Sequence, residues 1–194
     1  MTVRQFLSVF FVLPCFFATA ADTSSEAQQR LHGAVDEVLH AAESAKSKAS
    51  LVEHLRPILE KHISFNVMTR RAVGPGWRQF SAEEQAKATQ LFTTLIIRSY
   101  SNKFTLGEHP AVQYQKAATP APGRVDVATI TVYQGSRYSV TYRMEQEEGW
   151  HITDVVIEGV SMIANYRSQL DAAFKKGGAS TVLSSLSESI SRPQ

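Results

Sequence analysis

The sequence predicts an α+β fold, in which a curled antiparallel sheet of about four strands packs against several helices. Three observations lead to this prediction. Apolar residues follow the helical period through the first half of the chain, and the period changes to two after Pro110. A helical pattern then returns after Ser161. This order of helices, strands and helices in 194 residues indicates one domain with its own core.

The first 20 residues have the features of a signal peptide. Arg4 supplies a positive charge, and residues 6–17 form an apolar run that is too short to span a bilayer. Residues 18–20, Ala-Thr-Ala, are a cleavage site of small residues. We therefore expect an exported protein whose mature part is a single domain of residues 21–194. A membrane anchor at the N-terminus is the alternative.

Removal of this segment changes the composition of the mature chain. It takes away Cys15, the single cysteine, so the mature chain has no thiol for a disulfide, a nucleophile or a metal site. It also leaves 19 of the 20 basic residues against 18 acidic ones, with no long run of either sign. That balance argues against nucleic acid as a partner and against strong electrostatic binding to membranes.

Three helices are predicted before the first strong stop signal. Residues 24–43 follow the helical period throughout. A second helical pattern begins at Leu51, and Pro57 within it predicts a kink or a break between two short helices. A short helix over residues 65–73 should end at the Gly-Pro-Gly of residues 74–76.

A capping box opens the next helix. Ser81 and Glu84 have the required spacing, and the helical pattern that follows them runs to about Phe104. The apolar face of this helix is wide, which suits a helix that lies across a sheet or a ligand.

The region after Pro110 is predicted to form an antiparallel meander. Residues 118–123 contain two prolines and a glycine and are predicted to be a loop. The turns fall at Gln134-Gly135-Ser136 and at residues 147–149. The four strands that these segments separate are residues 112–117, 124–133, 137–145 and 150–157.

The last strand leads without a long loop into a helix, and the change occurs at Gly159-Val160-Ser161. Ser161 is the expected N-cap of this helix, and Gly177-Gly178 should break it before a final helical segment. The period of two places four residues of the strand on one face: Trp150, Ile152, Asp154 and Val156.

Motifs for catalysis are weak in this chain. The glycines at 74 and 76 lack the strand and helix context of a phosphate-binding loop. The histidines of the first two helices are spaced by eight residues, whereas metal ligands on one helix face need a spacing of four: His32, His40, His54 and His62. We therefore expect no metal, no other cofactor and no enzymatic activity.

Asp154 is the one carboxylate with a candidate role. Buried in an apolar interior it would have a raised pKa and could act as a general base, as in the cone-shaped folds that host ketosteroid isomerase. Alternatively it has a structural role and accepts hydrogen bonds near Ser161. An isomerase-like enzyme that uses Asp154 is therefore kept as an alternative.

Large apolar residues are more abundant than two packed layers need. They either fill a solid core or line a pocket between sheet and helices. We predict that eleven residues line such a pocket: Trp77, Phe92, Ile96, Tyr100, Val140, Tyr142, Trp150, Ile152, Val156, Val160 and Ile163.

Several sequence blocks together resemble the MlaC family of periplasmic phospholipid-binding proteins, also known as toluene-tolerance auxiliary components of an ABC transporter. They extend in the family's order over nearly the whole mature chain. The blocks are Pro57 to Phe65, Val73 to Trp77, Phe80 to Gln85, the helix from Phe92 to Tyr100, Gly149 to Val155, and Gly159-Val160-Ser161 leading to Tyr166-Arg167 and Gln169.

The resemblance implies a soluble periplasmic carrier that moves a phospholipid between the outer and inner membranes and so maintains outer-membrane lipid asymmetry. It implies a fold like the cone of nuclear transport factors, with added N- and C-terminal helices. The implied partners are an inner-membrane ABC transporter with its lipid-binding ring subunit and an outer-membrane lipoprotein complex.

Two departures from the family pattern affect the details. Ser64 stands where the family usually has aspartate, and Pro75 and Gly76 replace a basic and an aromatic residue. Both changes lie near the expected mouth of the pocket, so lipid preference or partner contacts can differ. A carrier of hopanoid or another polycyclic lipid, and an adaptor that carries no lipid, are the remaining alternatives.

Overall fold

The computed structural model describes residues 20–102, 106–108 and 110–192. The helices are α1 (Ala20–Ser44), α2 (Lys48–His62), α3 (Phe65–Val73), the 3-10 helix η1 (Gly74–Gln79), α4 (Ala82–Ser101) and α5 (Met162–Ser191). The strands are β1 (Ala111–Tyr114), β2 (Ala118–Ala121), β3 (Arg124–Tyr133), β4 (Ser136–Glu147), β5 (Gly149–Ile157) and β6 (Val160–Ser161). The α+β class is confirmed. The predicted signal peptide lies outside the described residues, apart from Ala20.

The six strands form one antiparallel sheet in the order β1-β3-β4-β5-β6, and β2 also pairs with β3. The sheet has two short strands more than predicted. The predicted loop at residues 118–123 was wrong, because Ala118–Ala121 pairs with β3 at its two ends. A register shift between those ends leaves Pro120 without a required backbone hydrogen bond, which is how proline is tolerated at a sheet edge.

A β-bulge interrupts β5. Met144 on β4 pairs with Ile152 and Arg143 pairs with Asp154, so Thr153 is the extra residue. The bulge reverses the alternation of faces beyond it. The prediction that Asp154 and Val156 share a face with Trp150 and Ile152 was therefore wrong, because the simple period of two does not survive the inserted residue.

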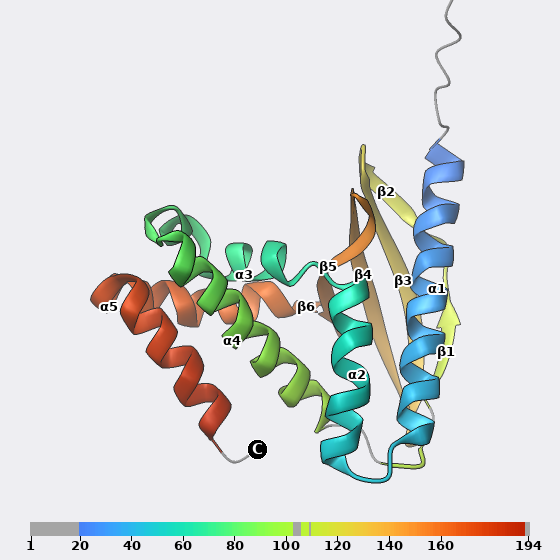
Figure 1. Ribbon diagram of the computed structural model, residues 1–194. Coiled ribbons are helices and arrows are strands. Elements are labelled where there is room, and N and C mark those ends of the chain that lie inside the picture. The colour runs from blue at the N-terminus through green and yellow to red at the C-terminus, as the bar shows by residue number, and fades with distance from the viewer. Residues whose placement is uncertain (1–19, 103–105, 109, 193–194) are drawn as a thin grey trace, which may run out of the picture.

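Helix α1 covers one face of the sheet, and α2 packs beside α1 (Figure 1). The core between α1 and the sheet consists of Ala27, Leu31, Val125, Val127, Met144, Trp150 and Ile152. A smaller apolar cluster of Ala41, Leu51 and Leu55 joins α1 to α2. We call α1, α2 and the six strands the sheet lobe.

Of the kink or break predicted at Pro57, the break is absent, since α2 runs through this residue from Lys48 to His62. Pro57 removes the donor that would bond the carbonyl of Glu53. Both residues are exposed, so solvent can satisfy that carbonyl without interrupting the helix.

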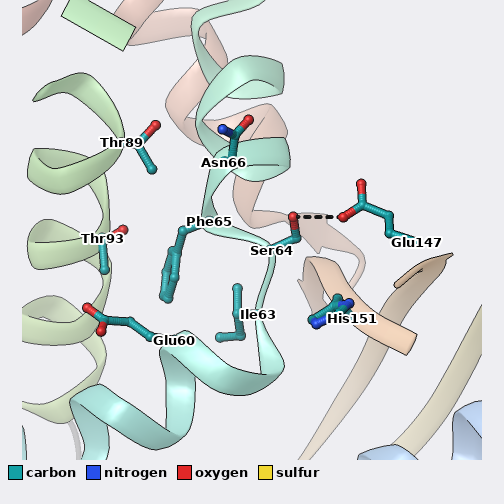
Figure 2. A pocket seen from close by; sticks show the side chains of 9 residues that line it. All are labelled: Glu60, Ile63, Ser64, Phe65, Asn66, Thr89, Thr93, Glu147 and His151. Carbon is teal, nitrogen blue, oxygen red and sulfur yellow. Dashed lines mark hydrogen bonds between the residues drawn. The ribbon is translucent and has the colours of Figure 1, made fainter. Parts of the chain in front are cut away.

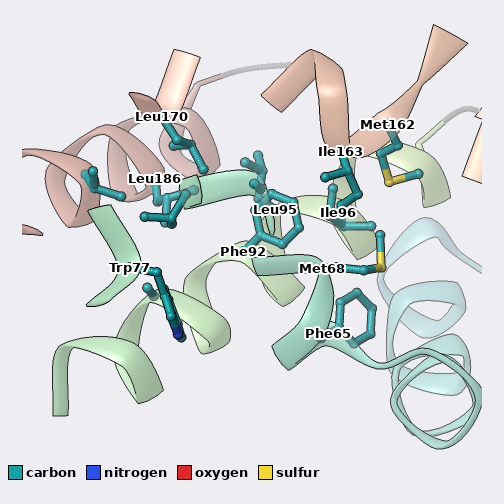
Figure 3. Close-up of a cluster of buried hydrophobic side chains, with 14 of the residues drawn as sticks. Phe65, Met68, Trp77, Phe92, Leu95, Ile96, Met162, Ile163, Leu170 and Leu186 are labelled. Atoms are coloured by element: carbon teal, nitrogen blue, oxygen red, sulfur yellow. The ribbon is translucent and has the colours of Figure 1, made fainter. Parts of the chain in front are cut away.

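The remaining helices form a second unit, which we call the helical lobe: α3, η1, α4 and α5 (Figure 1). Figure 3 shows its core, in which side chains from all four helices meet, among them Trp77, Phe92, Leu95, Ile163, Leu170 and Leu186. The capping box of Ser81 and Glu84 is present at the start of α4. This helix ends at Ser101, before the expected end at Phe104, which lies outside the described residues.

Helix α5 changes direction at Gly177 and Gly178, as predicted, since neither residue has helical torsion angles. Its second half then runs beside α4 (Figure 1). Among the described residues, no helix has an apolar stretch long enough to cross a membrane.

Candidate functional site

The chain passes between the two lobes three times. It crosses at Ile63-Ser64 between α2 and α3, in the connection from α4 to β1, and at Ser161-Met162 between β6 and α5. Strand β5 holds the first crossing, because Ile63 forms a parallel bridge with Ile152 and the Ser64 amide donates to the Ile152 carbonyl at 2.9 Å.

Asp154 of the same strand holds the third crossing. Its carboxylate accepts a hydrogen bond from the Ser161 hydroxyl at 2.6 Å and another from the Ile163 amide in the first turn of α5 at 3.2 Å. Arg143 donates to the same carboxylate at 3.1 Å. Asp154 is only 5% exposed and its two oxygens are engaged by these donors. This geometry is that of the structural alternative, an acceptor at a helix N-terminus.

Ser161 is the N-cap of α5, as predicted, and its hydroxyl accepts from the Ala164 amide at 3.1 Å. No long loop separates the strand from the helix, as predicted. A turn with positive φ at Glu158 and Gly159 precedes β6, whose two residues pair back onto Val156 and Ile157. The corner thereby adds a short edge strand that the sequence pattern did not indicate.

The apolar cores of the two lobes meet along a seam. Two residues, Ile63 and Val155, pack against both the core of the helical lobe and the core between α1 and the sheet. The two cores are otherwise built from different residues. Ligand access to both would require the lobes to separate at these two side chains.

A cleft of about 440 Å³ opens at the seam (Figure 2). Ile63 and Phe65 form its apolar part, between α4 on one side and the β4-β5 turn on the other. The rest of the lining is polar: Glu60, Ser64, Asn66, Thr89, Thr93, Glu147 and His151. The volume lies in the range of small-molecule sites, but such a lining suits a polar group better than a hydrocarbon chain.

An ion pair connects the two lobes, and a second one within the sheet lobe shares its carboxylate. Arg71 of α3 donates to both carboxylate oxygens of Glu145 on β4, at 2.7 and 2.8 Å. Arg124 pairs with the same carboxylate at 3.2 Å. The Ser64 hydroxyl lies 3.5 Å from a carboxylate oxygen of Glu147, a distance at the limit of a hydrogen bond.

His62 is buried next to the seam, at the end of α2. Its Nε2 lies 3.1 Å from Glu37 of α1, and its Nδ1 is buried with no hydrogen-bond partner among the described residues. Burial lowers the pKa of His62 below its ordinary value, against the opposite effect of the Glu37 hydrogen bond. Hydrogen bonds from Lys61 and His62 lower the pKa of Glu37.

The eleven predicted pocket residues fall into three groups. Trp77, Phe92, Ile96 and Ile163 are buried in the core of the helical lobe, with Tyr100 packed against it. Trp150 and Ile152 are buried under α1, with Tyr142 packed against them. The other three are strand residues outside both cores, and Val160 among them is 63% exposed: Val140, Val156 and Val160.

None of the eleven lines the cleft at the seam. The residues that do line it were missed because Ile63-Ser64-Phe65 reads locally as a link between two helices. Its position depends on a bridge to β5, which is distant in sequence. Ser64 carried a signal in the sequence, as one of the departures from the family pattern.

No group of His, Cys, Asp and Glu side chains in the described part of the chain could hold a metal ion. The histidines at the eight-residue spacing have other contacts. His32 stacks on Tyr114 with ring centroids 3.4 Å apart, and His40 and His54 lie beside Glu43 and Ser44.

The structure is that of a two-lobed α+β protein, in which the lobes have separate apolar cores and a cleft opens between them. The chain belongs to the MlaC family, since the family model described as MlaC protein matches residues 29–188. A search of curated proteins finds no significant match.

A solved structure supports the fold. The phospholipid-binding protein from Ralstonia solanacearum, determined in complex with a phospholipid, superposes with a TM-score of 0.78. The two chains are 24% identical, and the match covers 85% of this chain and 97% of the other.

Proposed function

We propose that this protein is a phospholipid carrier that holds the acyl chains between its two lobes. Membership of the MlaC family is the observation that carries the proposal. The phospholipid held by the structural neighbour supports it, as does a seam at which two apolar cores meet.

The physical chemistry of the ligand explains why a carrier needs such a seam. Two acyl chains contain on the order of 30 methylenes, so their exposure to water costs roughly 25 kcal/mol at about 0.8 kcal/mol each. A phospholipid therefore does not cross an aqueous space unaided. Separation of the lobes at Ile63 and Val155 would expose two apolar surfaces of suitable character, and the chains would replace the contacts that these surfaces make with each other.

In this proposal the cleft determines the orientation of the bound lipid. Its hydroxyl and amide groups suit the polar head, and its carboxylates suit a cationic part of that head rather than the phosphate. The glycerol backbone would lie near Ile63 and Phe65, with the chains deeper in the seam. The eleven predicted pocket residues remain candidates for contact with the chains. Eight of them belong to, or pack against, one of the two cores that would separate.

We further propose a periplasmic location and a shuttle between an inner-membrane ABC transporter, with its lipid-binding ring subunit, and an outer-membrane lipoprotein complex. In this scheme residues 1–20 are the removed signal peptide and residues 21–194 form a single lipid-binding domain. The pattern of the N-terminal residues and the known family support this assignment.

Native mass spectrometry of the protein purified from the periplasm tests the carrier proposal. The expected result is one bound phospholipid, which chloroform extraction and fragmentation identify by its head group and chains. A bound hopanoid would favour the polycyclic-lipid alternative. Protein that remains empty after incubation with phospholipid vesicles would contradict both.

A further inference from the structure

The fold divides the charges of the chain very unevenly. Residues 64–102 and 161–192, which build the helical lobe, contain nine Lys and Arg residues and four Asp and Glu residues, a net charge of +5. Residues 23–63 and 106–160, in the sheet lobe, contain nine basic and 13 acidic residues, a net charge of −4. The near balance of the whole chain therefore conceals a protein with a basic and an acidic end.

The basic charge is concentrated where α3, η1 and α5 meet. Figure 1 places this region at the end of the molecule away from the sheet. Helix α5 lies close against the turn between α3 and η1, because a Cβ on Gly74 would lie 3.3 Å from Arg167 Nε and one on Gly76 would lie 2.7 Å from the Phe174 ring. Arg70 lies in the last turn of α3, four residues before Gly74.

Three basic residues at this junction are exposed and form what we call the basic patch: Arg70, Arg78 and Arg167. In the described part of the chain none of the three pairs with a carboxylate, whereas Lys175 is paired with Asp171 and Arg71 with Glu145. Three unpaired cations at one end of the molecule attract an anionic partner.

We propose that the basic patch is a docking surface for an anionic phospholipid bilayer. Protein interfaces usually centre on buried aromatic or aliphatic anchors. The patch has no such anchor, because the large apolar side chains that are exposed in the described residues, Tyr138 and Val160, belong to the sheet lobe. Long basic side chains without an apolar centre suit the diffuse charge of lipid phosphates.

The same charge division sets the orientation of the protein at the bilayer. The negative sheet lobe is repelled by an anionic surface, while the helical lobe is attracted. The interaction is peripheral and weakens with salt, because exposed charges are screened within a Debye length. This proposal does not depend on the carrier function.

Co-sedimentation with vesicles tests it. Wild-type protein should bind vesicles of equal parts phosphatidylcholine and phosphatidylglycerol at low ionic strength, bind phosphatidylcholine vesicles weakly, and dissociate from both as salt rises. Replacement of two patch residues, Arg70→Gln with Arg167→Gln, should weaken the binding to phosphatidylglycerol vesicles about 25-fold, from roughly five-fold for each basic residue.

The matched control makes the same charge change on the sheet lobe, at Lys46 and Lys116, both exposed and both replaced by Gln. It should retain wild-type binding. Equal binding of wild type to the two kinds of vesicle, or an equal loss in the control, would overturn the proposal. So would salt-sensitive self-association that the patch variant abolishes, since the patch would then fit the acidic lobe of a second copy.

Discussion

Replacement of Asp154 by alanine should destabilise the protein by disconnecting α5 from the sheet. The change removes the acceptor for the Ser161 hydroxyl and for the Ile163 amide, and the site is too buried for water to replace it freely. Hydrogen bonds to a charged group contribute about 1.5–3 kcal/mol each. The pair with Arg143 adds little, because the arginine side chain is 49% exposed.

The expected loss is therefore about 3 kcal/mol in the free energy of unfolding, since two charge-assisted hydrogen bonds of moderate strength disappear. For a chain of this size, that corresponds to a fall in Tm of about 6–12 °C. Urea denaturation followed by circular dichroism measures the first quantity, and a thermal melt measures the second. The conservative variant Asp154→Asn keeps one acceptor oxygen and should lose about half as much.

An Asp154→Ala protein within about 0.5 kcal/mol of wild type would refute this reasoning, because surface changes without a structural role fall in that range. It would also return Asp154 to the list of candidate catalytic groups. A stability loss with unchanged lipid binding per folded molecule would instead agree with a purely structural carboxylate.

Three further predictions concern other parts of the structure. Burial holds the pKa of His62 below its ordinary 6.5, so the unfolded chain takes up the proton first and the free energy of unfolding should fall as pH drops below 6.5. In a His62→Gln variant, urea denaturation across this pH range should show a smaller slope of the free energy of unfolding against pH. An unchanged slope would argue against His62. Gly76→Ala should destabilise the protein by about 2 kcal/mol, because the new Cβ would lie 2.7 Å from the Phe174 ring. Gly33→Ala, on the exposed face of α1, should instead stabilise it by about 0.8 kcal/mol. Thermal melts measure both effects, and equal effects would contradict the packing described. Ile63→Glu should abolish phospholipid retention in native mass spectrometry, while Tyr138→Glu at an exposed site outside the predicted pocket retains it. Retention in both variants would argue against the seam.

The sequence predicted those elements whose signals are local. The capping box at Ser81, the N-cap at Ser161 and the breaks at Gly74 and Gly177 each depend on a few neighbouring residues, and all appear where expected. Strand β3 begins and ends where the period of two begins and ends. Such signals act through backbone torsion angles and caps, which tertiary contacts rarely override.

The errors arose where pairing between distant segments decides the outcome. Nothing near Thr153 indicates a bulge, because the extra residue is defined only by its partners on β4. Likewise, Ala118–Ala121 becomes a strand only because β3 lies beside it. The break allowed for at Pro57 is absent for a different reason, since exposure of the helix face made the missing hydrogen bond tolerable.

The candidate site was the least predictable part. Apolar composition identified residues of both cores correctly as large and buried, such as Phe92 and Trp150, but it could not divide them between two lobes. That division depends on where the chain crosses the seam. The charge division has the same origin, because Arg70 and Arg167 are far apart in sequence and come to one junction only in the folded chain.

The three crossings also constrain how the molecule can be made. The helical lobe is assembled from two separate segments, residues 64–101 and 162–191, with the strands synthesised between them. Neither lobe is a contiguous stretch that could be excised or exchanged between proteins. All residues of the sheet lobe are synthesised before α5, whereas the helical lobe is complete only after α5 has emerged, so the seam closes at the end of synthesis.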